Sequence, residues 1–275
     1  MILLHTWNMR GYSFMFFLAF LSGWILMNLF YRKERIETRS LDSLFIYTVL
    51  GTIIGARFGH ILFYNLIFFK NHCMEAFFPV WENPKEGYEF IGYRGLSSHG
   101  AAIGLIISNW LYSKRIIKKP FLWISDRICI PITLGGVFVR IGNFFNYEIV
   151  GKPTDLPWAV KFIKMDREYG KLVPRHPTQL YESLADLCIF FILLLIFHNK
   201  KQYLGYITGL FFILLWSVRF IIEFVKEPQG REILHISILN TGQLLSIPFI
   251  ILGFFIMGLE KICQYYEHYK RTIIL

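Results

Sequence analysis

The chain has 275 residues, of which 55% are hydrophobic, 18% aromatic and only 17% charged. A soluble domain usually carries about a quarter of charged residues, so this composition excludes an ordinary soluble domain and indicates an integral membrane protein. The net charge of +10 would suit a nucleic-acid partner. In membrane proteins, however, Lys and Arg concentrate in short cytoplasmic loops, so no nucleic acid is expected here.

Long apolar runs predict the membrane-spanning helices, because about 20 mostly apolar residues are needed to cross a bilayer. We predict seven spans, of which the third and fifth are short: 13–30, 41–63, 99–113, 121–142, 183–197, 204–225 and 239–259. No Gly-, Ser- or Pro-rich linker divides them, so 1–275 is predicted to be one membrane domain. The fold class expected is all-α and polytopic, with about seven transmembrane helices around a lipid-accessible cavity.

The basic loops predict the orientation of the chain. Lysines and arginines cluster after the first, third and fifth spans, at 32–39, 114–119 and 200–201. These loops alternate along the chain and are therefore predicted to be cytoplasmic. The N-terminus and the segment 143–182 would then face outward, with the C-terminus inside. The first span lacks a strongly basic start and a small-residue cleavage site, so we expect it to be retained.

The fourth span ends in the stretch R-I-G-N-F-F-N-Y-E-I-V-G, residues 140–151. On a helix Arg140, Asn143 and Tyr147 would share one face. A helix end near Asn143 would place Asn146 and Glu148 on a turn that folds back over this face. A snorkelling arginine among interfacial polar residues is the alternative interpretation.

Two further polar groups enter predicted spans. His99 lies in S-S-H-G-A-A-I-G at the start of the third span, where it is either a hydrogen-bonded structural residue or a proton acceptor. In H-P-T-Q-L-Y-E-S, residues 176–183, a proline suits the first helical position. Gln179, Glu182 and Asp186 then line one face of the fifth helix.

Arginines are expected to meet at the outward end of the bundle. Arg219 and Glu223 are four residues apart and could form a structural ion pair, or Arg219 could serve a site. Arg57 adds a cation at the same predicted depth as Arg140. Three guanidinium groups with few free carboxylates favour an anion site, and phosphate suits their planar fork. The four cysteines are scattered and suggest neither a disulfide framework nor a metal site.

These residues resemble the prolipoprotein diacylglyceryl transferase family. Residues 140–151 are similar to its signature G-R-x-G-N-F-x-N-x-E-x-x-G, and depart from it only at Val139. Further segments resemble the family in the expected order and cover nearly the whole chain: Gly55–Gly59, His99-Gly100, Asp126, His176–Glu182, Arg219–Glu223 and Gly242–Pro248. The sequence departs from the family pattern at three positions. Ser13 follows Tyr12 where the family usually has a glycine, Ala101 replaces a second glycine after the histidine, and Leu215, beside Trp216, replaces a tyrosine.

The resemblance implies that the protein moves the diacylglyceryl group of phosphatidylglycerol to the lipobox cysteine thiol of a prolipoprotein. Glycerol 1-phosphate leaves in this first step of bacterial lipoprotein maturation. The implied partners are phosphatidylglycerol, prolipoprotein signal peptides with a lipobox cysteine, and membrane lipids. No cofactor and no metal are implied, and the location would be the bacterial cytoplasmic (inner) membrane.

The resemblance also implies roles for individual residues. Arg140 and Arg219 would contact the phosphate, and His99 would take the thiol proton. Asn143, Asn146 and Glu148 would hold the glycerol head or orient Arg140. The full set of residues expected to bind substrate is Tyr12, Arg57, Asn143, Asn146, Glu148, Gly151, His176, Gln179, Tyr181, Glu182 and Glu223.

Three other functions are weaker alternatives. A transporter for an organic anion would also collect arginines at the middle of a helical bundle. An intramembrane protease lacks support, because neither G-x-S-x-G nor a paired-aspartate motif is present. A CDP-alcohol transferase would need a cluster of metal-binding aspartates, which this sequence does not contain.

Overall fold

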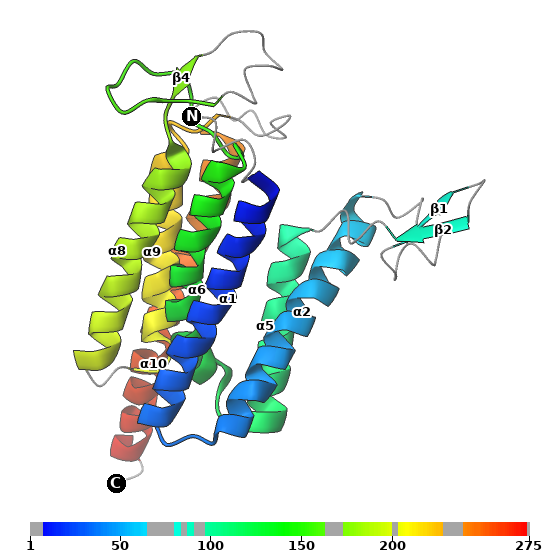
Figure 1. Ribbon diagram of the computed structural model, residues 1–275. Helices are drawn as coiled ribbons and strands as arrows, with labels where there is room; N and C mark the ends of the chain where they lie inside the picture. The colour runs from blue at the N-terminus through cyan, green and yellow to red at the C-terminus, as the bar shows by residue number, and fades with distance from the viewer. Residues whose placement is uncertain are drawn as a thin grey trace. The chain divides into compact units, whose positions relative to one another are not determined.

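The computed structural model describes residues 8–64, 80–83, 87–90, 97–162, 173–199, 203–227 and 239–273 (Figure 1). Within these residues the chain is mostly helical. The helices are α1 (Asn8–Lys33), α2 (Thr38–Tyr64), α5 (Ser98–Tyr112), α6 (Phe121–Phe145), α8 (Thr178–Asn199), α9 (Tyr206–Ile222) and α10 (Thr241–Ile273), with a π-helical turn η2 (Ser113–Ile117) after α5. Two short antiparallel pairs form from β1 (Val80–Asn83) with β2 (Gly87–Phe90) and from β3 (Val160–Lys161) with β4 (Pro174–Arg175).

Each predicted span corresponds to one of these helices, so the all-α, polytopic membrane fold is confirmed. Among the described residues, α1, α2, α6, α8 and α10 are long and apolar enough to cross a membrane. Helices α5 and α9 are shorter, with 15 and 17 residues. The fifth predicted span was drawn too short: α8 has 22 residues, because it begins at Thr178 and includes polar residues ahead of the apolar run.

The fold divides into two compact units. One unit contains Met1–Phe30 and Ser125–Leu275, and the other contains Tyr31–Ile124. Helices α8, α9 and α10 and most of α1 and α6 belong to the first unit. Helices α2 and α5 belong to the second. The single membrane domain expected from the sequence stays a prediction.

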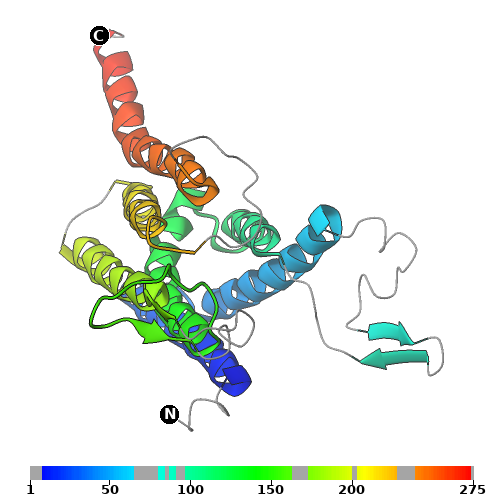
Figure 2. The ribbon, with the colours of Figure 1, turned by 90° about the horizontal axis from the view of Figure 1, so that it is seen from above.

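In the first unit, α6 lies between α1 and α8, and α9 packs beside α10 (Figures 1 and 2). Glycines allow the close approach of these helices. A Cβ atom on Gly136 would lie 2.7 Å from a carboxylate oxygen of Asp186, and one on Gly209 would lie 2.5 Å from the carbonyl oxygen of Gly253. The first turn of α1 and the last turn of α10 stand at opposite ends of this unit (Figure 1).

Asp126, on α6, caps the start of α9. Its carboxylate accepts hydrogen bonds from the backbone N–H groups of Gly205 (2.7 Å) and Thr208 (2.8 Å) and from the Thr208 hydroxyl (2.6 Å). The first N–H groups of a helix have no partner within the helix. A carboxylate there accepts hydrogen bonds from them and also interacts favourably with the positive end of the helix dipole. Asp126 therefore fixes α9, which carries Arg219, against α6.

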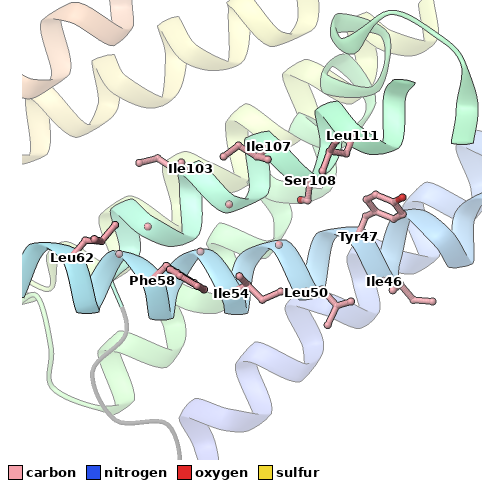
Figure 3. A pocket seen from close by; sticks show the side chains of 15 residues that line it. Ile46, Tyr47, Leu50, Ile54, Phe58, Leu62, Ile103, Ile107, Ser108 and Leu111 are labelled. Carbon is pink, nitrogen blue, oxygen red and sulfur yellow. The ribbon is translucent and has the colours of Figure 1, made fainter. Parts of the chain in front are cut away.

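In the second unit, α2 and α5 pack through small residues. Gly51, Gly55 and Gly59 recur every fourth residue on α2 and face Gly100 and Gly104 on α5. A Cβ atom on Gly59 would lie 2.6 Å from the Cα atom of Gly100. Small residues at 97–104 thus let α5 approach α2 closely. Apolar side chains flank the glycines, among them Leu50, Ile54, Phe58, Ile103 and Ile107 (Figure 3).

The start of α5 is capped by Ser97. Its hydroxyl accepts a hydrogen bond from the Gly100 N–H at 3.3 Å, and its own N–H donates to the carbonyl of Ala56 at 2.9 Å. The helix begins at Ser98. His99 therefore lies in the first turn of α5, as the sequence predicts.

Candidate functional site

The polar signature forms a strained turn at the end of α6. The helix continues to Phe145, and the N–H of Glu148 donates to the carbonyl of Asn143 at 3.0 Å. Tyr147 and Ile149 both have a φ of 58°, in the left-handed region. This conformation is unfavourable for a β-branched residue and costs on the order of 1–3 kcal/mol, so neighbouring groups must hold the turn.

The start of α8 supplies the groups that hold this turn. The Thr178 hydroxyl donates to the carbonyl of Ile149 at 2.7 Å, and the Gln179 amide donates to the carbonyl of Glu148 at 2.5 Å. Both donors are fully buried, with 0% of their surface exposed. The substrate-binding role expected for Gln179 stays a prediction, because the bond observed here supports the turn.

Glu148 folds back over α6, as the sequence predicts. Its carboxylate accepts hydrogen bonds from the side-chain amides of Asn143, at 2.9 Å, and Asn146. The Tyr12 ring lies against Gly142, where a Cβ atom would be 3.2 Å from Tyr12 Cδ2. Since Gly142 directly precedes Asn143, this contact places the Tyr12 ring beside the signature turn. Tyr12, Asn143, Asn146 and Glu148 thus form one polar cluster.

Gly151, the last residue of the signature, lies where three segments meet. It forms a bridge with Lys226, which follows α9, and its N–H donates to the carbonyl of His176 at 3.0 Å. A Cβ atom on Gly151 would lie 2.5 Å from the Cβ of His176. Glycine is required here because no side chain fits.

Arg140 forms an ion pair with Glu182 on α8. Its Nε atom lies 2.7 Å from Glu182 Oε2, and its Nη1 atom lies 3.5 Å from the Asn143 amide oxygen. The Arg140 side chain is 22% exposed, whereas the Glu182 side chain is 6% exposed. Glu182 thus tethers Arg140 through Nε, and the outer nitrogen atoms of the guanidinium are the part suited to meet an anion.

Lys226 lies between two glutamates. Its ammonium group is 3.4 Å from Glu182 Oε1 and 3.7 Å from Glu223 Oε2, and its side chain is 6% exposed. The sequence left open a structural ion pair between Arg219 and Glu223, and that interpretation is wrong. Glu223 pairs with Lys226 instead, three residues further along the chain.

Arg219 rests on an aromatic stack. Its guanidinium carbon lies 5.4 Å from the centroid of the Trp216 ring, which stacks on Phe249 at 4.2 Å. The buried Arg219 Nε atom has no hydrogen-bond partner among the described residues. Trp216 thus supplies an aromatic contact in the region where the family's usual tyrosine is Leu215.

His176 and Tyr181 are joined to the loop that precedes β3. The Tyr181 hydroxyl lies 3.3 Å from His176 Nδ1 and accepts a hydrogen bond from the Trp158 indole N–H at 2.7 Å. Trp158 is 57% exposed. These contacts connect an exposed aromatic ring to the start of α8.

Sequence reasoning missed the basic residues outside the helices. Besides Lys226, the buried Arg175 donates to the carbonyl of Gly151 at 3.3 Å and forms an ion pair with Glu227. The only sequence signal was the Lys-Glu pair directly after the sixth apolar run. Its partners lie on other segments, so spacing along the chain does not reveal them.

Two predicted site residues belong to the second unit. Arg57 lies on α2 and His99 on α5, and the His99 side chain lies outside the described residues. The structure therefore brings together the predicted residues of the first unit. The approach of Arg57 and His99 to Arg140 stays a prediction.

The fold and this site define a polytopic helical membrane protein with arginine, lysine and glutamate side chains gathered at one end of its helices. The family model for prolipoprotein diacylglyceryl transferase matches residues 1–259. The chain belongs to that family of transferases, which confirms the resemblance found in its signature.

Curated relatives cover almost the full chain. A protein from Bacteroides fragilis is 37% identical over 252 residues, which span 91% of this chain and 88% of the relative. One from Tolumonas auensis is 38% identical over 250 residues, 90% of each chain. One from Porphyromonas gingivalis is 37% identical over 258 residues, 90% of this chain and 86% of the relative. All three are named phosphatidylglycerol–prolipoprotein diacylglyceryl transferase.

Proposed function

We propose that this protein is a phosphatidylglycerol–prolipoprotein diacylglyceryl transferase. The sulfur of a lipobox cysteine forms a bond to the glycerol carbon that carries the phosphate of phosphatidylglycerol. The bond from this carbon to the phosphate oxygen breaks, and glycerol 1-phosphate leaves with the bonding electrons. The thiol proton passes to a base, and a thioether-linked diacylglyceryl group remains on the peptide.

The observation that carries this proposal is the tethered Arg140 at the end of the signature helix. As the carbon–oxygen bond breaks, negative charge grows on the leaving phosphate. A guanidinium that is already oriented stabilises this charge without having to reorganise during the reaction. Glu182 supplies the orientation, since it holds Arg140 Nε at 2.7 Å.

Arg219 is the second cation that we assign to the phosphate. Its guanidinium is placed by the Trp216 ring, and its buried Nε lacks a hydrogen-bond partner among the described residues. An unsatisfied buried donor is costly. A phosphate oxygen bound at this position would remove that cost.

We assign His99 as the base that accepts the proton of the lipobox thiol. A free thiol has a pKa of about 8.5, so only a small fraction is the nucleophilic thiolate at neutral pH. Histidine is the side chain best matched to accept a proton in this range. Its place in the first turn of α5 puts it at the end of a helix that packs on α2 through glycines.

The polar cluster of Tyr12, Asn143, Asn146 and Glu148 suits the glycerol head of the lipid. Amide, hydroxyl and carboxylate groups can each exchange a hydrogen bond with the hydroxyls of that head. Through Asn143, this cluster also orients the Arg140 side chain. The remaining residues assigned to binding or to shaping a lipid-accessible cavity are Arg57, Gly151, His176, Gln179, Tyr181, Glu182 and Glu223.

The proposed location is the bacterial cytoplasmic membrane, with segment 143–182 on the outer face. The alternating basic loops support this orientation. Residues 143–162 and 173–182, where described, form the signature turn, the β3–β4 pair and the start of α8. A lipobox peptide would therefore meet Arg140 at the outer end of the helices.

Purified protein incubated with phosphatidylglycerol vesicles and a lipobox peptide tests the proposal. We expect a peptide whose mass has increased by one diacylglyceryl group, and an equal amount of glycerol 1-phosphate. A peptide with Ser in place of the lipobox Cys is the control and should stay unmodified. Uptake of an organic anion into vesicles without lipid turnover would instead support a transporter.

A further inference from the structure

We infer that Lys226 is a positioning residue that keeps Arg140 and Arg219 available to the phosphate by engaging the two glutamates nearest to them. This inference rests on the proposed function for its substrate. It assigns Lys226 no contact with the lipid or with the peptide.

The geometry places Lys226 at the centre of a chain of charges. Its ammonium group lies 3.4 Å from one oxygen of Glu182, and the other oxygen of Glu182 lies 2.7 Å from Arg140 Nε. On its other side it lies 3.7 Å from Glu223. Three segments contribute: α6 carries Arg140, α8 carries Glu182, and the end of α9 and the turn after it carry Glu223 and Lys226.

The position of Lys226 also affects Arg219. A glutamate four residues after an arginine on a helix can form an ion pair with it. Here the Glu223 carboxylate pairs with Lys226, and Arg219 Nε is left buried without a hydrogen-bond partner among the described residues. Lys226 therefore competes successfully for Glu223, and Arg219 stays available to an external anion.

The charge balance leads to the same conclusion. Arg140 and Lys226 together match the charges of Glu182 and Glu223, whereas the nearby carboxylate of Glu148 is held by the side-chain amides of Asn143 and Asn146. Without Lys226, the two carboxylates would outnumber the charge on Arg140. The two carboxylates would then attract both arginines, because the interaction between charges is stronger in a buried site than in water. An incoming phosphate would then meet fewer available cations.

The test compares Lys226→Met with Lys152→Met. Lys152 lies on the neighbouring segment and is exposed, and its ammonium group donates to the backbone carbonyl of Phe224 at 2.8 Å. Both variants lose one positive charge at this end of the protein, but only Lys226 engages carboxylates. We expect Lys226→Met to raise the KM for phosphatidylglycerol about tenfold or more and to leave the KM for the lipobox peptide unchanged. We expect Lys152→Met to change both values less than twofold.

Two further variants separate charge from shape. Lys226→Arg keeps the charge and should restore the KM for phosphatidylglycerol to within about threefold of the parent. Lys226→Gln keeps a polar side chain of similar length but removes the charge, and should raise this KM as Lys226→Met does. If Lys226→Met fails to fold, the comparison of Lys226→Arg with Lys226→Gln decides. An unchanged lipid KM in Lys226→Met, or an equal lipid KM in Lys226→Arg and Lys226→Gln, would overturn the inference.

A binding readout makes the inference independent of turnover. Glycerol 1-phosphate should raise the melting temperature of the parent protein, because a ligand that binds the folded state stabilises it. Lys226→Met should lose this increase, whereas Lys152→Met should keep it. If the parent binds glycerol 1-phosphate in a Lys226-dependent way but lipidates no peptide, the proposed function fails and the inference stands. An equal increase in both variants contradicts the inference alone.

Discussion

Thr178 donates a hydrogen bond to the carbonyl of Ile149, 2.7 Å away, at the residue where the signature turn takes a left-handed backbone conformation. A β-branched side chain disfavours that conformation. The contact joins the first residue of α8 to the turn after α6. The geometry of the signature therefore depends on a helix that begins almost thirty residues later.

Removing this hydrogen bond should loosen the turn. Thr178→Val keeps the shape of the side chain but leaves the Ile149 carbonyl without its partner, which costs about 1–3 kcal/mol. We expect a lower melting temperature and a lower rate of lipidation. Ile149→Gly relieves the backbone strain, so the double variant should recover part of the rate. A rate in Thr178→Val equal to that of the parent would show that the bond does not position the turn.

Gly151→Ala should disrupt the same region by steric overlap. The new Cβ atom would lie 2.5 Å from the Cβ of His176 and 2.6 Å from its carbonyl oxygen. Gly258→Ala is the matched control, because nothing lies within 4 Å of a Cβ atom there. Lipidation should fall at least tenfold in Gly151→Ala and stay normal in Gly258→Ala. Similar rates in both variants would show that the close packing at Gly151 is not needed for lipidation.

The sequence predicts the helical organisation well, because long apolar runs in a membrane protein leave little choice. It also predicts that Gln179, Glu182 and Asp186 share a face of one helix, and all three are buried. This succeeds because helical spacing is a local property.

Pairing between segments is where sequence reasoning fails. Glu223 has Arg219 four residues before it and Lys226 three residues after it, and spacing alone does not choose between these partners. The choice depends on Glu182, on another helix, which draws Lys226 into the same cluster. In the same way, the role of Asp126 becomes clear only when α9 is seen to begin against it.

For Arg140 we predict that even Arg140→Lys loses most of its activity. Lysine keeps the charge but not the two-pronged fork that matches a phosphate. The fall in kcat/KM should be at least tenfold at unchanged expression. Arg127→Lys, near the other end of α6, should be close to normal. Near-normal turnover of Arg140→Lys would reduce Arg140 to a structural or snorkelling residue.

The orientation can be tested by single cysteines at positions 33, 117 and 165 in a background without the native cysteines. Position 33 is the last residue of α1 and position 117 the last residue of η2, both in basic segments, and position 165 lies outside the described residues. In intact cells, an impermeant thiol reagent should label position 165 and spare the other two. The opposite pattern would reverse the predicted topology.

The pH dependence of His99→Gln tests the base. Raising the pH toward 9 produces thiolate directly, since a free thiol has a pKa of about 8.5. The ratio of the His99→Gln rate to the parent rate should therefore rise between pH 7 and 9. The ratio for Arg140→Lys should stay nearly constant, because arginine remains charged. A constant ratio for His99→Gln would exclude His99 as the base.

The most direct test of the transferase follows the two halves of the lipid separately. Phosphatidylglycerol that carries one label in its acyl chains and another in its phosphate is incubated with the protein and a lipobox peptide. We predict that the acyl label appears on the cysteine of the peptide and that all of the released phosphate label is in water-soluble glycerol 1-phosphate. Phosphate label on the peptide, or release of glycerol 1-phosphate without acyl label on the peptide, would contradict diacylglyceryl transfer.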